Sequence, residues 1–424
     1  MNKEIIKNAK LNEQYTHIKH KTGLDIYIWK MENYSTTHAL FGTKYGSVNV
    51  KFKTNKDKDF ITVPNGIAHY LEHKLFENED CDVFSLYAKT GASANAYTSF
   101  DKTCYLFSCT DNFEESLEIL LDFVQNPYFT DETVQKEQGI ITQEIKMYQD
   151  NPGWRVFFNM LQGMYYNHPV KIDIAGTVES IAKIDKDLLY RCYNTFYNLN
   201  NMVLSIAGNV DEETVIKICD KMLKPCENIE LQTAFEDEPY NVVQDKVTQK
   251  LEVSLPIFNI GFKQKPFSGV EMVKAEVETN IVLSLLADET SDFYKRLYDS
   301  GIINSTFSTE VFDGDGYFCP IFGGESRNPD DVLKNIVEEV ERCKTEGFNE
   351  ERFNIIKKSY YGSLIRDLND VETIATIMLN SGMDGHSAFE LIEVVANVTF
   401  EDVKKRLEAF DTQNVTMSVI EPNE

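Results

Sequence analysis

The chain has 424 residues with 42 basic and 68 acidic side chains, which gives a formal net charge of −26. A nucleic-acid-binding protein needs a basic excess or a basic block to neutralise phosphates, and the sequence has neither. With 42% hydrophobic and 12% aromatic residues, the composition is that of a globular protein, and the length favours two or three domains.

The first residues include lysines but no apolar segment behind them, and no later run approaches the roughly 18 apolar residues of a membrane helix. We therefore expect a cytoplasmic protein without a signal segment or a membrane partner. The eight cysteines are scattered and form no C-x-x-C pair, so we expect reduced structural thiols.

The first informative element is a helix predicted over residues 67–77. Pro64, Asn65 and Gly66 indicate a turn with Asn65 as the helix cap. His69 and His73, four residues apart, lie one turn above each other on such a helix, so both can bind one zinc ion. Glu72 stands beside them and is suited to act as a general base. This H-x-x-E-H order is the inverted zincin motif.

A strand with small side chains is predicted after Gly91. The residues Ala92, Ala94 and Ala96 would allow another backbone to approach closely. As an edge strand, this segment could hold an extended peptide through main-chain hydrogen bonds. A strand simply packed against a helix explains the small residues equally well.

A second helix is predicted from Thr130, which acts as its cap, to about Tyr148. Glu137 and Glu144 are seven residues apart and therefore lie on nearly the same face. One of them could bind the zinc, while the other accepts a hydrogen bond from the ring nitrogen of a ligand histidine that does not face the metal. A solvated acidic face is the alternative reading.

The chain also contains an internal repeat at about half its length. Residues 184–207 resemble residues 398–421, and a looser similarity relates 82–109 to 292–321. Between the halves, residues 226–246 lose periodicity and indicate a polar linker. We therefore predict domains at 1–225 and 247–424. Strand-like runs at 201–207 and 251–255 mix with amphipathic helices at 331–343 and 350–365, which favours an α+β fold with mainly antiparallel sheets.

The sequence resembles the insulinase/pitrilysin-type zinc peptidases, and more narrowly their short two-domain bacterial members with paired subunits. The resemblance spans essentially the whole chain and is most specific in 69–77, 91–98, Tyr105, 126–129, 137–152 and 176–181. It implies two homologous α+β domains, each an antiparallel sheet covered by helices, facing each other as a clamshell with the mitochondrial-processing-peptidase-like metallohydrolase fold.

The resemblance also assigns roles to individual residues. It implies that His69, His73 and Glu144 are the zinc ligands and that Glu72 is the general base. Glu137 would be the carboxylate that supports a ligand histidine. The matching positions of the edge strand, Asn95 and Ala96, would bind the substrate.

The second half departs from the family pattern. Its repeat of the motif helix, at 281–287, has no metal ligand. Catalytic members often carry an Arg and a Tyr here that bind the substrate and the oxyanion, and these positions are Tyr298 and Asn304 in this chain. Because the loss of one oxyanion donor typically costs a factor of about 10² to 10³ in rate, we expect a homologous partner subunit to supply the missing pair.

The leading prediction is a zinc endopeptidase for short or unfolded peptides, acting as the catalytic half of a heterodimer. The alternative is a non-catalytic structural subunit with the same fold. Such subunits usually lose metal ligands, whereas every implied ligand is present here.

Overall fold

The computed structural model describes residues 2–79 and 82–423, and the chain divides into two compact units. Unit 1 comprises Met1–Gln143, Asp173–Ala234 and Ile365–Phe389. Unit 2 comprises Glu144–Ile172, Phe235–Leu364 and Glu390–Glu424. Each unit therefore takes segments from both halves of the sequence. The predicted boundary at the linker did not include this exchange.

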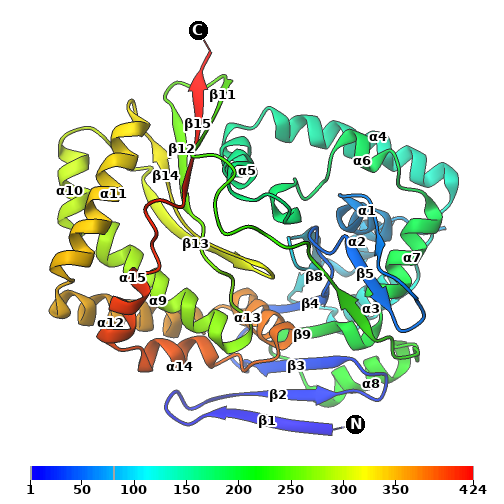
Figure 1. The fold of residues 1–424 in the computed structure, drawn as a ribbon. Helices are drawn as coiled ribbons and strands as arrows, with labels where there is room; N and C mark the ends of the chain where they lie inside the picture. The colour runs from blue at the N-terminus through cyan, green and yellow to red at the C-terminus, as the bar shows by residue number, and fades with distance from the viewer. Residues whose placement is uncertain (1, 80–81, 424) are drawn as a thin grey trace. The chain divides into compact units, whose positions relative to one another are not determined.

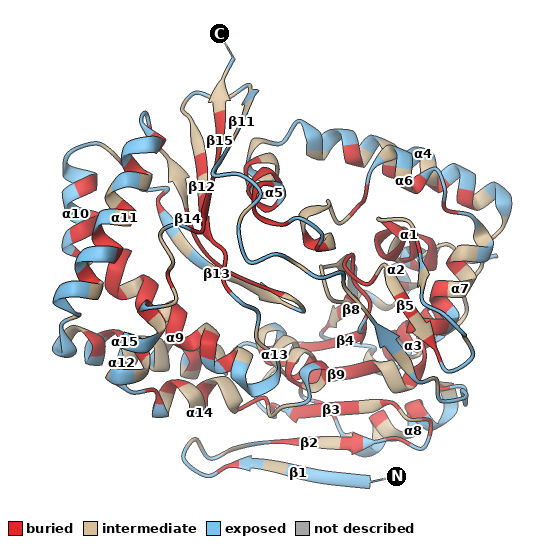
Figure 2. Ribbon diagram, in the orientation of Figure 1, coloured by how far each residue is buried: buried red, intermediate tan, exposed pale blue. Residues whose placement is uncertain are grey.

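Unit 1 is built on a sheet that has seven strands within the described residues. Their spatial order is β1 (Asn2–Asn8), β2 (Glu13–Lys19), β3 (Asp25–Lys30), β9 (Met202–Gly208), β4 (Thr37–Thr43), β8 (Thr103–Cys109) and β7 (Ser93–Thr98). Only β3 and β9 pair in parallel, and the other neighbours are antiparallel. Strands β4 and β9 are buried at every residue, as their apolar sequences require (Figure 2).

Unit 2 repeats five strands of this sheet, those from β3 to β7 in the spatial order, without equivalents of β1 and β2. The order is β11 (Lys246–Leu251), β15 (Val415–Pro422), β12 (Ile257–Phe262), β14 (Tyr317–Glu325) and β13 (Ser308–Gly314) (Figure 1). Again the first pair is parallel and the others are antiparallel. The predicted duplication and the predicted α+β class are therefore both visible in the strand order.

The helices of unit 1 are α1 (Ile67–Leu75), α2 (Val83–Thr90), α3 (Phe113–Gln125), α6 (Val178–Ile181), α7 (Lys186–Phe196), α8 (Glu212–Met222) and α13 (Val371–Asp384). Those of unit 2 are α5 (Pro152–Met164), α9 (Gly269–Ala287), α10 (Asp292–Asp299), α11 (Pro329–Glu346), α14 (Glu390–Asn397) and α15 (Phe400–Leu407). The division of the chain falls inside α4 (Asp131–Gln149) and near the end of α12 (Glu350–Asp367).

On each sheet packs one helix that comes from the opposite half of the sequence. Helix α13 packs on β9 and β4, and α5 packs on β15 and β12. Glycines allow the close approach, because a Cβ on Gly42 would lie 2.6 Å from the Met383 methyl, and one on Gly261 would lie 2.6 Å from the Met164 methyl. In both units, therefore, a glycine on the equivalent strand lets a methionine of the covering helix pack closely against the sheet.

The segment predicted as a linker, 226–246, is partly ordered by pairing. Within it, β10 (Leu231–Thr233) pairs with β5 (Lys51–Thr54), which also pairs with β6 (Ile61–Thr62). The prediction of a strand at 251–255 is wrong. The strand there is β11, which ends at Leu251 because its parallel partner β15 ends opposite, at Pro422.

The seven described cysteines are free thiols, as expected, and Cys81 lies outside the described residues. Over residues 2–79 and 82–423, no helix is long and apolar enough to cross a membrane.

Candidate metal centre

Helix α1 begins at Ile67, as its sequence suggested, but its cap is not the predicted residue. The residue that caps it is Gly66, with φ of 90°, and no side chain caps the helix, so the prediction of Asn65 as the cap is wrong. A Cβ at Gly66 would lie 2.4 Å from the Ala175 carbonyl oxygen. Both the left-handed backbone and this close approach require glycine. The Asn65 carbonyl instead accepts a hydrogen bond from Ser180.

The apolar face of α1 fixes how its polar residues are presented. Ile67, Tyr70, Leu71 and Leu75 are all buried. The Tyr70 hydroxyl donates to the Val134 carbonyl and so ties α1 to α4. Helix α4 begins at Asp131 after Thr130, whose hydroxyl accepts from the Thr133 amide at 3.2 Å, as the predicted cap requires.

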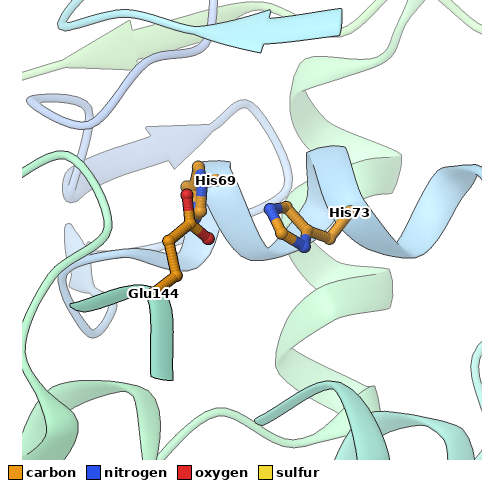
Figure 3. A group of neighbouring side chains, drawn as sticks. All are labelled: His69, His73 and Glu144. Atoms are coloured by element: carbon orange, nitrogen blue, oxygen red, sulfur yellow. The ribbon is translucent and has the colours of Figure 1, made fainter. Parts of the chain in front are cut away.

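Three metal-ligating side chains come together on these two helices. His69 and His73 project from α1 and Glu144 from α4 (Figure 3). One donor atom of each lies within 4.8 Å of the others. The donors around one tetrahedral zinc lie roughly 3.4 Å apart, so small side-chain rotations suffice to gather them. In the described part of the chain this is the one such group of histidine, cysteine or acidic residues.

Glu137 supports one of the histidines. Its carboxylate Oε1 lies 2.9 Å from His73 Nδ1, and Glu137 is buried. A carboxylate on one ring nitrogen fixes the tautomer and turns the other nitrogen towards a metal. Glu137 thus contacts one of the two motif histidines, and its role toward a metal stays a prediction.

Glu72 is held by a residue that the sequence reading missed. Thr98 Oγ1, at the end of β7, donates to Glu72 Oε2 at 2.8 Å. The turn after β7 is closed by a hydrogen bond from the Ser99 amide to the Lys102 carbonyl at 2.8 Å. The only sequence signal for Thr98 is that it closes the small-residue strand, because its contact with α1 depends on tertiary packing.

A buried pair of tyrosines lies behind Glu72. The hydroxyls of Tyr105 and Tyr197 are 2.8 Å apart. Burial raises the pKa of both phenols, and the Glu72 charge raises each pKa further. Both phenols therefore stay protonated at neutral pH, so they do not compete with Glu72 as bases.

Strand β7 forms one end of its sheet, with β8 as its neighbour in the described residues. It also packs against α1. Asn95 is exposed and Ala96 is half-buried, and Asn95 Oδ1 accepts from the Ala96 amide at 2.9 Å. The strand predicted to bind an extended peptide thus has a free edge next to the helix that carries Glu72.

The positions Tyr298 and Asn304 in unit 2 do not form a donor pair like the Arg and Tyr of catalytic relatives. Tyr298 stacks on Tyr294 with ring centroids 5.8 Å apart. Asn304 Nδ2 donates to Glu325 at 3.0 Å, and its Oδ1 accepts from the Thr306 amide. Asn304 is therefore bonded both within its own turn, to the Thr306 amide, and to Glu325 at the end of β14.

Comparison with known proteins identifies the family. Residues 62–178 match the family described as insulinase (peptidase family M16), and residues 183–360 match the peptidase M16 inactive domain. The chain is 42% identical over 404 residues to "Uncharacterized zinc protease YmfH" of Bacillus subtilis, and the match covers 94% of each chain. The chain belongs to peptidase family M16.

Other relatives agree with this assignment. An M16-like peptidase from Alicyclobacillus acidocaldarius has 32% identity and a TM-score of 0.93, covering 96% of this chain and 98% of its own. The mitochondrial-processing peptidase subunit beta of Caenorhabditis elegans is 29% identical over 186 residues, or 42% of this chain and 40% of its own. The family resemblance and the two-domain α+β fold are confirmed, and relatives named zinc proteases support a peptidase.

Proposed function

We propose that this M16 chain is a zinc-dependent endopeptidase with His69, His73 and Glu144 as ligands and Glu72 as general base. The observation that carries the proposal is the convergence of the three donors within 4.8 Å. Two imidazoles and one carboxylate are a ligand set of catalytic zinc sites, which keep a further position for water. The His73–Glu137 contact at 2.9 Å also suits such a site.

A zinc ion held there supplies a Lewis acid that activates water and polarises the peptide carbonyl. Glu72 takes the proton of the attacking water and passes it to the leaving amine. The hydrogen bond from Thr98 holds the Glu72 carboxylate in one orientation. Since an oriented base needs no reordering during the reaction, this bond contributes to the rate.

The substrate class that fits is a short or unfolded peptide in an extended conformation. Such a peptide would add to the edge of β7 by main-chain hydrogen bonds. The Ala96 amide, now bonded to the Asn95 side chain, would turn to the substrate, and Asn95 would be released to bind it. These two residues are our proposed substrate contacts.

We further propose that the chain is the catalytic half of a heterodimer. Tyr298 and Asn304 provide no replacement for the Arg and Tyr of catalytic relatives, because Tyr298 stacks on Tyr294 and Asn304 is bonded to Glu325 and to the Thr306 amide. A homologous subunit that carries the pair would complete the oxyanion site. One relative is named as subunit beta of a peptidase, which supports pairing of this kind.

Zinc content and peptide cleavage test the proposal together. We expect about one zinc per chain in the wild type and in Glu72→Gln, and little zinc in Glu144→Gln. Cleavage should be lost in both variants. Glu132→Gln, an exposed change in the first turn of the same helix, is the matched control and should retain both zinc and cleavage. A wild-type chain that holds no zinc and cleaves no peptide would instead favour the structural subunit, and an active Glu72→Gln would contradict the role of Glu72 as general base.

The partner is tested by mixing. Cleavage of a quenched peptide by the chain alone should be slow, and it should rise on addition of a homologous chain that carries the Arg and Tyr. Equal rates with and without that chain would contradict the heterodimer. Neither outcome affects the zinc proposal, which the zinc content of the variants tests separately.

A further inference from the structure

Glu144 has a hydrogen-bond partner on its own helix. The Tyr148 hydroxyl donates to Glu144 Oε1 at 3.0 Å. Residues four apart lie on one helix face, and the later side chain points back over the earlier one. Tyr148 is therefore placed by helix geometry to hold Oε1 of the Glu144 carboxylate.

Tyr148 is itself held by Trp154. Their ring centroids are 4.5 Å apart and the planes differ by 18°, which is a stacked arrangement. Trp154 lies in the first turn of α5, where its amide donates to the side chain of the helix cap Asn151 at 3.1 Å. Phe158, one turn later, also packs against Trp154, with ring centroids 5.3 Å apart.

We infer that Tyr148 and Trp154 are positioning residues that set the orientation of Glu144 for zinc, and that Trp154 reports zinc binding. The inference rests on the proposed zinc site. A glutamate side chain has several rotatable bonds, and ordering it on metal binding has an entropic cost. The Tyr148 hydrogen bond orders Glu144 beforehand, and the stack on Trp154 restrains Tyr148. Zinc capture by Glu144 then alters the contact between Tyr148 and the indole.

Zinc affinity measures this role without relying on activity. The chain is stripped with a chelator and titrated with zinc against a chromophoric competitor. Loss of a group that orients a ligand typically weakens metal binding by a factor of roughly 10 to 100, and we expect a loss in this range for Tyr148→Phe. Tyr34→Phe is the matched control, because Tyr34 donates a similar bond, at 2.9 Å, to the Asn369 carbonyl elsewhere in unit 1. It should bind zinc like the wild type.

Tryptophan emission provides the second readout. The chain has two tryptophans, and Trp29 is buried in the core of unit 1. We expect tryptophan emission to change as zinc is added and then to level off. The midpoint of this change should match the zinc affinity measured by chelator competition. The change should disappear in Trp154→Phe and shrink in Tyr148→Phe.

The outcomes separate the two proposals. Wild-type zinc affinity in Tyr148→Phe overturns the positioning role, and an emission change that persists in Trp154→Phe overturns the reporting role of Trp154. The zinc peptidase stands in both cases. A wild-type chain that binds no zinc overturns both. Weaker zinc binding in Tyr148→Phe, together with no change in tryptophan emission on zinc addition to Trp154→Phe, supports the inference.

Discussion

Replacing Thr98 by valine tests how Glu72 is oriented. The change keeps the branched shape of the side chain and removes the donor that lies 2.8 Å from Glu72 Oε2. A hydrogen bond to a charged group contributes about 1.5 to 3 kcal/mol. If the bond acts mainly in the transition state, its loss lowers kcat by a factor of roughly 10 to 150. KM should change little, because Thr98 orients the base.

The assay is cleavage of a quenched fluorescent peptide in the presence of the homologous chain, with kcat and KM determined separately. Thr98→Ser keeps the hydroxyl and should recover most of kcat. Zinc content should match the wild type in both variants. A fully active Thr98→Val with normal zinc, measured beside an inert Glu72→Gln, would refute the orienting role of Thr98. An unfolded Thr98→Val would show a lowered melting temperature that Thr98→Ser does not share.

Three further changes test other parts of the structure. Glu137→Gln weakens the support of His73 and should reduce zinc affinity by a factor of roughly 10 to 100, measured by chelator competition. Lys263→Met removes the buried ammonium that binds Glu238 at 2.7 Å, and the carboxylate left behind should lower the free energy of unfolding by about 3 kcal/mol; an unchanged denaturation midpoint would contradict this. Burial raises the pKa of Glu276 from 4.5 to about 7, so the folded state prefers its protonated form and stability falls as pH rises between these values. Glu276→Gln should therefore raise the free energy of unfolding at pH 8 by up to about 3 kcal/mol, seen as a higher melting temperature. At pH 4.5 the melting temperature should be nearly unchanged.

The candidate site was predictable from the sequence because its residues lie close together on two helices. The spacing of His69 and His73 defines one helix face, and Glu137 and Glu144 repeat at two turns of another. Local periodicity is strong in such helices, and both were predicted within two residues of their ends. The geometry brings together the residues that the family resemblance assigned.

Features that depend on distant packing were not predictable in the same way. The cap position 66 requires glycine because the Ala175 carbonyl oxygen would lie 2.4 Å from a Cβ there. Thr98 acts on Glu72 because β7 packs on α1. The exchange of α5 and α13 between sequence halves leaves no local pattern, since an amphipathic helix does not specify which sheet it covers.

That exchange affects how the protein is made. The core around β4 includes α13, whose residues start at Val371, and β15, an inner strand of the second sheet, starts only at Val415. Contacts between such distant segments form slowly. During synthesis, therefore, neither core can close until the ribosome has translated most of the message, and the apolar strands made first remain uncovered until then. A chain that stops before residue 371 would lack a core helix of unit 1 and an inner strand of unit 2, which makes it a substrate for chaperones and proteases.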